Sequence, residues 1–262
     1  MKKETEDKLA CSLTAETTEL VPFLPYLLQD FWELGSSPKD MIGLIEKHMS
    51  LKSDSKILDL ACGKGAVSVN IAKKLGINIY GFDLITEFIE YAKNKAKEFN
   101  VSDLCHFQCA DVNEIVDIEK DYDCVIFGAA GNILGNPEET LKKLKNPLKT
   151  GFGGYIIIDE AFLPDTGSNE EVKYKNYDYL THKEWLSLFE NNGLKLVEEL
   201  QNDEDYDFDT DNKNIVRRAN ELIMKYPQKR AIFEGYIKSQ SNECTDLERN
   251  VIAVTWMLQK LR

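Results

Sequence analysis

Short apolar runs alternate with longer amphipathic stretches from about residue 56 onward. The apolar runs predict five strands, at Lys56–Leu60, Ile77–Phe82, Leu104–Cys109, Tyr122–Phe127 and Gly154–Asp159. Apolar residues at helical spacing lie between these runs and predict helices at Ala66–Leu75, Ile85–Phe99 and Pro137–Leu148. Alternation of strand and helix is typical of a parallel sheet covered by helices on both faces, so the chain is predicted to be an α/β protein.

The pattern continues towards the end of the chain. Thr181–Asn191 is predicted to be a helix that ends at Asn192-Gly193, because glycine readily takes the left-handed conformation that follows a helix. Leu194–Leu200 and Asn250–Leu258 are predicted to be the sixth and seventh strands. We expect the last strand to be antiparallel, an arrangement that is common on otherwise parallel sheets.

Two segments fall outside this pattern, and both are predicted to be helical. The first is the leader, residues 1–52, and the second is the insert, residues 201–249, whose helical part is expected at Asn212–Ser239. Both are placed to form a lid over the carboxyl ends of the strands. We therefore predict one domain over 1–262, with its core at 53–200 and its final strand at 250–262.

Composition and charge narrow the class of protein. Hydrophobic residues make up 43% and charged residues 29% of the 262 residues, which is enough to form a core of ordinary size. The formal net charge of −13 disfavours a nucleic-acid partner, because binding DNA or RNA requires a basic surface. No apolar run reaches the length of a membrane span. We expect a cytoplasmic monomer or homodimer with no nucleic-acid or membrane partner.

Neither the cysteines nor the acidic run predicts a metal site. The six cysteines form no Cys-x-x-Cys pair, and Cys105, Cys109 and Cys124 lie in strands predicted to be buried, which favours reduced core thiols. The run Asp203–Asp211 has the alternate carboxylates of a calcium loop. It lacks the glycine at the sixth position and the closing glutamate, so a solvated loop is favoured.

The most informative stretch is the end of the first strand, where Asp59 is followed by the glycine turn Gly63-Lys64-Gly65. Two glycines at the carboxyl end of a strand let a ligand lie against bare backbone. The free N–H groups of the next helix point into the same crevice. Asp59 attracts a cationic group and repels a pyrophosphate. A nucleoside with a positive end, such as S-adenosylmethionine, fits this description.

The next three strands also end in residues suited to a nucleoside. Ligands of open α/β sheets bind at the carboxyl ends of the strands. Asp83, at the end of the second strand, is placed to accept both hydroxyls of a ribose. Asp111, after the third strand, can accept from an exocyclic amine. Gly128 and Ala129, after the fourth strand, allow a close approach to the backbone.

The segments Ile57–Gly65, Gly81–Asp83 and Ala110–Val112 together resemble the class I S-adenosylmethionine-dependent methyltransferases, over roughly Leu51 to Glu160. The resemblance implies a Rossmann-like, doubly wound, seven-stranded sheet in the order 3-2-1-4-5-7-6, with the last strand antiparallel and a helical cap. It also implies S-adenosylmethionine as the cofactor.

The resemblance also implies which residues bind the cofactor. The core residues that it places there are Asp59, Ala61, Cys62, Gly63, Gly65, Asp83, Leu84, Asp111, Val112, Phe127, Gly128 and Ala129. The segment Leu34–Pro38 further resembles a turn of uncharacterised bacterial small-molecule methyltransferases, which adds Gly35 and Ser36. At Ala61 the family commonly has glycine, and we expect the extra methyl group to cost little unless the backbone there needs a positive φ.

Methyl transfer requires a base only if the acceptor must lose a proton. Asp159 and Glu160, at the end of the fifth strand, are expected to face the acceptor pocket. Glu160 is the predicted catalytic residue, which binds an amine acceptor or accepts its proton. The alternative is that Glu160 is a solvated acid at a strand end. His182 is also a possible base, but Thr181-His182-Lys183-Glu184 is typical of a helix start capped by Thr181.

Two other functions are compatible with parts of the pattern. In an NAD-dependent oxidoreductase, Gly63-x-Gly65 followed by Asp83 would match the dinucleotide fingerprint, but Ser68 replaces the third glycine and Asp59 would repel the pyrophosphate. A non-catalytic S-adenosylmethionine-binding protein would carry the same cofactor motifs. The favoured hypothesis is methyl transfer to a small-molecule acceptor, whose identity the sequence leaves open.

Overall fold

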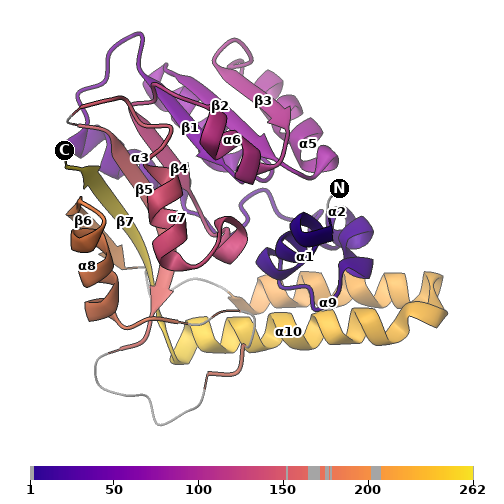
Figure 1. Ribbon diagram of the computed structural model, residues 1–262. Helices are drawn as coiled ribbons and strands as arrows, with labels where there is room; N and C mark the ends of the chain where they lie inside the picture. Colours follow the sequence, from indigo (N-terminus) through magenta and orange to yellow (C-terminus); the bar gives the residue numbers. More distant parts are fainter. Residues whose placement is uncertain are drawn as a thin grey trace.

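A seven-stranded mixed sheet forms the centre of the molecule (Figure 1). The computed structural model describes residues 3–151, 153–164, 172–174, 177, 179–201 and 208–261. The strands are β1 (Lys56–Leu60), β2 (Asn78–Asp83), β3 (Cys105–Cys109), β4 (Cys124–Phe127), β5 (Tyr155–Phe162), β6 (Leu194–Gln201) and β7 (Ile252–Lys260). Their order is β3-β2-β1-β4-β5-β7-β6, and β7 is antiparallel to both of its neighbours. The predicted order and the predicted antiparallel strand are confirmed.

Helices cover both faces of the sheet because neighbouring residues of a strand point to opposite sides. On one face, Ile57, Ile126 and Ile157 pack against three helices: α3 (Pro38–His48), α4 (Ala66–Leu75) and α5 (Thr86–Glu98). On the other face, Leu58 and Ile158 pack against three further helices: α6 (Val112–Ile118), α7 (Pro137–Leu144) and α8 (His182–Asn191). The strands of the sheet centre are therefore buried on both sides.

The local signals at helix starts explain which helices the sequence revealed. Thr181 caps α8 by accepting a hydrogen bond from the Glu184 backbone N–H, and Glu184 reaches back to the Thr181 N–H, so the predicted cap is confirmed. Helix α6 was not predicted because it spans only the seven residues after its cap, Asp111. Such a short helix shows less than two full turns of apolar periodicity.

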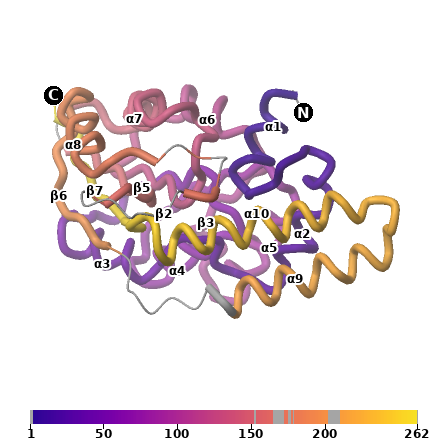
Figure 2. The backbone as a smooth tube through the Cα atoms, turned by 90° about the horizontal axis from the view of Figure 1, so that it is seen from below, coloured from indigo at the N-terminus to yellow at the C-terminus, as the bar shows by residue number. Residues whose placement is uncertain are grey.

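The leader and the insert pack together at the carboxyl ends of the parallel strands. Within the leader, α1 (Lys3–Ser12), η1 (Thr18–Phe23) and α2 (Leu24–Leu27) lie there, whereas α3 covers a face of the sheet and so does not join the predicted lid. The insert forms α9 (Phe208–Lys225), η3 (Pro227–Lys229) and α10 (Arg230–Arg249). Figures 1 and 2 show α9 and α10 side by side as a long pair, with α1 and α2 lying along it. Leu20 and Leu24 of the leader share a buried cluster with Ile215 and Phe233 of the insert.

The structure tests the burial that was predicted for the three strand cysteines. Cys105 and Cys124 are buried as expected, but the prediction for Cys109 was wrong because its side chain is exposed. Cys109 is the last residue of β3, beyond Cys105 and Phe107, which point to the same face and are buried. The acidic run Asp203–Asp211, for which a solvated loop was favoured, lies mostly outside the residues that the structure describes, and its last residues belong to α9. None of the described helices is long and apolar enough to cross a membrane.

Candidate active site

Two adjoining hollows lie at the carboxyl ends of β1, β2 and β4. The larger has a volume of about 550 Å³ and the smaller about 380 Å³. Leu34, Ala61, Gly63 and Gly128 line both hollows, so the two form one continuous cleft. The cleft therefore lies where the topology of the sheet predicts a ligand.

Most of the residues predicted to bind the cofactor line this cleft. The larger hollow is lined by Ala61, Gly63, Asp83, Leu84, Asp111, Val112, Gly128 and Ala129. The smaller hollow is lined by Ser36, Asp59, Ala61, Cys62, Gly63 and Gly128. Gly35, Gly65, Phe127 and Glu160 are not among the residues that line either hollow. Phe127 is 1% exposed, and its side chain packs in the core on the α6–α7 face, so only its backbone is available to a cofactor.

The glycine turn after β1 requires left-handed backbone at several positions. Gly63 and Gly65 have φ angles of 52° and 73°. A Cβ atom on Gly65 would lie 2.7 Å from the Ala92 Cβ and 2.9 Å from the Phe107 ring, so no side chain fits there. Ala61 also has a positive φ of 58°, which is the condition under which its methyl group was expected to carry a cost. An L-residue in this conformation costs roughly 1–2 kcal/mol.

Asp83 ties the glycine turn to the end of β2. One of its carboxylate oxygens accepts a hydrogen bond from the Gly63 N–H at 2.9 Å, and the other accepts from the Ile85 N–H at 2.9 Å. Burial raises the pKa of Asp83 to about 6, while these backbone donors favour the ionised form. Asp83 therefore fixes the bare backbone of the turn and also presents a carboxylate to the larger hollow.

Asp111 joins the third strand end to the leader. Its Oδ1 caps α6 by accepting from the Asn113 N–H at 2.9 Å, and its Oδ2 accepts from the Thr5 hydroxyl at 2.9 Å. Helix α1, which carries Thr5, lies across the larger hollow, where Leu9 and Leu13 line it. The leader is thus part of the wall of the site, as the predicted lid requires.

Asp59 is the most deeply buried acid of the cleft, with 3% of its surface exposed. Its Oδ2 accepts a hydrogen bond from the Ser68 hydroxyl at 2.5 Å. Burial raises the pKa of Asp59 to about 7, the Ser68 hydroxyl opposes this rise, and the carboxyls of Asp83 and Asp159 add to it. The charges that act on Asp59 are thus negative, which leaves it suited to a cationic ligand.

The leader turn Gly35-Ser36 packs directly on the turn Gly128-Ala129. A Cβ atom on Gly35 would lie 2.8 Å from the Ala129 Cβ, and one on Gly128 would lie 2.2 Å from the Ser36 Oγ. Both glycines are required for this close approach of two backbone segments. The two turns bring the leader into contact with the end of β4, next to the smaller hollow.

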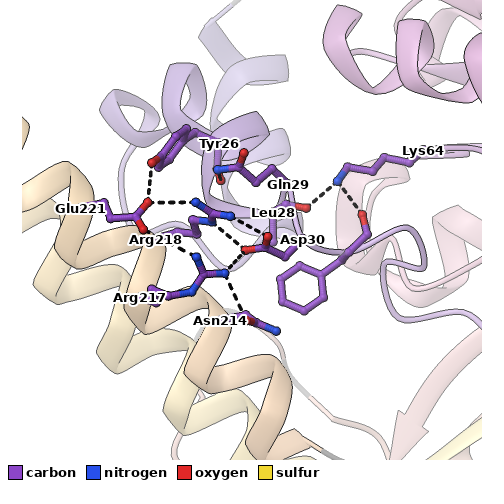
Figure 3. Close-up of polar contacts among 10 residues, drawn as sticks. Tyr26, Leu28, Gln29, Asp30, Lys64, Asn214, Arg217, Arg218 and Glu221 are labelled. Carbon is purple, nitrogen blue, oxygen red and sulfur yellow. Dashed lines mark hydrogen bonds and ion pairs between the residues drawn. The ribbon is translucent and has the colours of Figure 1, made fainter.

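Lys64, which lies between Gly63 and Gly65, binds the leader to the glycine turn. Its ammonium donates to the carbonyl oxygens of Leu28 and Phe31, the latter at 2.6 Å (Figure 3). The neighbouring Asp30 is held from the other side by Arg218 of α9, which donates twice to its carboxylate at 2.7 Å. Burial lowers the pKa of Lys64 to about 8, and the charge of Asp30 opposes this change.

Asp159 and Glu160 at the end of β5 point to opposite faces of the sheet. Asp159 lies on the α3 face and accepts from the Thr255 hydroxyl at 2.6 Å. Glu160 lies on the other face and accepts from the Tyr177 hydroxyl at 2.5 Å. Burial raises the pKa of Glu160 to about 7, with Tyr177 opposing and Asp159 adding to the rise. The expectation that both acids face the acceptor pocket needs correction for Asp159, which lies beside Ser36.

Several residues of the site gave little or no signal in the sequence. Ser68 drew notice only as the residue in place of a third glycine, although it is the hydrogen-bond partner of Asp59. Trp32, for which the apolar face of a leader helix was favoured over an aromatic wall beside the ligand, lines the smaller hollow and donates its indole N–H to the Lys64 carbonyl at 3.1 Å. Tyr177 lies far from any recognisable motif. Their roles depend on long-range contacts that no local pattern specifies.

The chemistry of the cleft fits S-adenosylmethionine. Bare glycine backbone allows close approach, the carboxylates of Asp83 and Asp111 line the larger hollow as hydrogen-bond acceptors, and Asp59 lines the smaller hollow, where a cationic group would be stabilised. A dinucleotide would bring its negative pyrophosphate against these buried carboxyls, which disfavours the NAD alternative.

Comparison with known proteins agrees with this conclusion. The family model described as a methyltransferase domain matches residues 51–228, more than half of the chain, and the chain belongs to this family. It is 29% identical over 158 residues to the uncharacterized protein YjhP of Escherichia coli, covering 57% of this chain and 61% of that protein. It is 29% identical over 124 residues to demethylmenaquinone methyltransferase of Staphylococcus saprophyticus, covering 47% of this chain and 51% of that protein. The matches thus span only part of these relatives.

A solved structure extends the fold likeness over most of the chain. The SAM-dependent methyltransferase of Thiobacillus denitrificans, in complex with S-adenosyl-L-homocysteine, matches with a TM-score of 0.73 and 22% identity. The match covers 90% of this chain and 97% of that one. The chain therefore belongs to the methyltransferase-domain family and shares the Rossmann-like fold of that S-adenosyl-L-homocysteine-bound enzyme.

Proposed function

We propose that the protein methylates a small-molecule acceptor that binds between α1 and the carboxyl ends of β4 and β5. The observation that carries this proposal is the position of α1, because its residues Leu9 and Ser12, with Leu13 directly after it, line the same hollow as Ala130 and Ile133. The acceptor must fit beside the cofactor in a cleft that the leader covers on one side. Such a space suits a small molecule better than a folded RNA or protein.

The cofactor supplies an activated methyl group on a sulfonium centre. The residues of the chain orient the reactants and exclude water, which accounts for most of the rate in such a displacement. Asp59 would hold the methionine part, Asp83 the ribose and Asp111 the adenine. The bare backbone of Gly128 and Ala129 would leave space near the reacting centre.

Glu160 is proposed to accept the proton that an amine acceptor must lose. A general base is most effective when its pKa lies near the working pH, and burial has raised the pKa of Glu160 to about 7. The Tyr177 hydroxyl donates to one oxygen of this carboxylate and so fixes its direction.

We further propose that the reaction takes place in the cytoplasm. Cys62, Cys105, Cys109, Cys124 and Cys244 are free thiols, as expected for a protein of a reducing compartment.

The test is an acceptor screen that measures S-adenosylhomocysteine by mass spectrometry. Small amines, alcohols and thiols are tested as separate pools, with bulk tRNA and unfolded protein as comparison substrates. We expect product with the amine pool and none with tRNA or protein. Methylation of tRNA or protein would contradict the proposal. Tight cofactor binding without product from any pool would favour the non-catalytic alternative.

A further inference from the structure

We propose that Asp159, acting through Ser36, is a second anionic anchor for the positively charged end of S-adenosylmethionine. Asp59 at the end of β1 is the first anchor. The inference rests on the identity of the cofactor and on the geometry around β5. It does not depend on which acceptor the enzyme uses.

The first observation is an unpartnered oxygen on Asp159. Its Oδ1 accepts from the Thr255 hydroxyl at 2.6 Å, and no described residue donates to its buried Oδ2 in ordinary hydrogen-bond geometry. The Ser36 hydroxyl acts on this carboxylate and lowers its pKa, against the rise caused by burial. Buried carboxylate oxygens in native proteins nearly always have a donor, so a ligand that orients the Ser36 hydroxyl towards Oδ2 would supply the missing hydrogen bond.

The second observation is the position of Ser36 beside this oxygen. A Cβ atom on Gly128 would lie 2.2 Å from the Ser36 Oγ and 3.1 Å from the Asp159 Oδ2, so both polar atoms approach the same bare backbone. Ser36 and Gly128 line the smaller hollow together with Asp59. A serine hydroxyl can donate to Asp159 and accept from a ligand ammonium at the same time, which makes Ser36 the connecting group.

The third observation is the charge balance of the hollow. Asp59 and Asp159 point to the same face of the sheet, and the charge of Asp159 raises the pKa of Asp59. The other charge acting on Asp159 comes from Asp40 of α3 and is also negative. Lys64 lines the hollow, but its ammonium is bound by carbonyl oxygens of the leader. A cationic ligand would balance these buried negative charges.

Three related ligands separate a charge effect from a general loss of the site. S-adenosylmethionine carries an ammonium, a sulfonium and a carboxylate, S-adenosylhomocysteine carries the ammonium and the carboxylate, and methylthioadenosine carries none of the three. Their dissociation constants are measured by calorimetry at pH 8 for the wild type, Asp159→Asn and Ser36→Ala. Glu160→Gln is the matched control, because it removes the neighbouring carboxylate from the opposite face of the sheet.

We expect Asp159→Asn to weaken S-adenosylmethionine binding about tenfold, as for the loss of one charge-assisted contact. Methylthioadenosine binding should stay within about twofold of wild type, and Glu160→Gln should bind all three ligands normally. If Asp159→Asn also weakens S-adenosylhomocysteine binding, the anchor acts on the ammonium. If the S-adenosylhomocysteine affinity of this variant is unchanged, the anchor acts on the sulfonium.

The connection through Ser36 has its own test. Ser36→Ala should weaken S-adenosylmethionine binding, and the double variant should be no weaker than Asp159→Asn alone, because the two residues act in series. Unchanged S-adenosylmethionine affinity in Asp159→Asn overturns the proposal. Equal losses for S-adenosylmethionine and methylthioadenosine also overturn it, because they show a structural role. Retained methylthioadenosine binding would confirm that the cofactor site itself is intact.

Discussion

Replacing Asp83 tests the link between the glycine turn and cofactor binding. Its carboxylate accepts two backbone hydrogen bonds, from Gly63 and from Ile85, and only 7% of the residue is exposed. Each hydrogen bond to a charged group contributes roughly 1.5–3 kcal/mol, so Asp83→Ala should lose about 3 kcal/mol or more of unfolding free energy. For a domain of this size, that loss lowers the melting temperature by roughly 6–12 °C.

The isosteric variant Asp83→Asn separates stability from binding. The amide oxygen of asparagine can still accept from one of the two backbone N–H groups, so about half of the stability should remain. The charged acceptor for a ribose is lost, and S-adenosylhomocysteine should bind at least about tenfold more weakly.

The assay combines urea unfolding with calorimetric titration at pH 8, where Asp83 is ionised. Unchanged S-adenosylhomocysteine affinity in folded Asp83→Asn would refute the ribose role. Unchanged stability of Asp83→Ala would show that the two backbone hydrogen bonds do not hold the turn.

Three further results are expected. Gly128→Ala should abolish cofactor binding in calorimetry, because its methyl group would overlap the Ser36 hydroxyl. Adding Ser36→Ala should restore part of the binding, and no recovery would disprove the contact between Gly128 and Ser36. Glu160→Gln should bind the cofactor normally but turn over at least about tenfold more slowly. The rise in kcat that the wild type shows through pH 7 should disappear in this variant, and an unchanged dependence of kcat on pH would exclude Glu160 as the base. Because burial raises the pKa of Asp59 to about 7 and of Asp159 to about 6, the folded protein binds more protons there than the unfolded chain. Relative to Asp159→Asn, the wild type should therefore lose stability in urea unfolding as pH rises from about 4 to about 6, the range between the ordinary pKa of an aspartate and that of Asp159 in the folded protein, and parallel curves would contradict this.

The sequence predicted the parts of the fold that depend on local patterns. Strand–helix alternation and the glycine turn around Gly63 predicted the parallel core, because apolar periodicity and backbone freedom are readable residue by residue. The short helix α6 and the exposure of Cys109 were not predicted. Exposure at the end of a strand depends on what the rest of the chain packs against it, and that is decided by the whole fold.

In the candidate site, too, the features that depend on local pattern were predicted and those that depend on long-range packing were not. Asp59, Asp83 and Asp111 follow strand ends and were identified from spacing, and the structure brings all three to one cleft. The pairing of Asp159 with Ser36 was not predicted, because the two residues are far apart in the chain and meet only through packing. The positive φ of Ala61 also escaped prediction, since alanine gives no sign of left-handed backbone.

The contacts of Lys64 and Arg218 on either side of Asp30 have a consequence for the order in which the protein becomes functional during synthesis. The leader leaves the ribosome first, yet Arg218, which holds Asp30 on the opposite side from Lys64, is 188 positions further along the chain. The β1–β5 region can begin to fold while the rest of the chain is still being made, as domains do during translation. The wall of the cleft formed by Trp32 and Ser36 must wait for α9. Nascent chains arrested before α9 should therefore contain the glycine turn but lack a completed cofactor pocket.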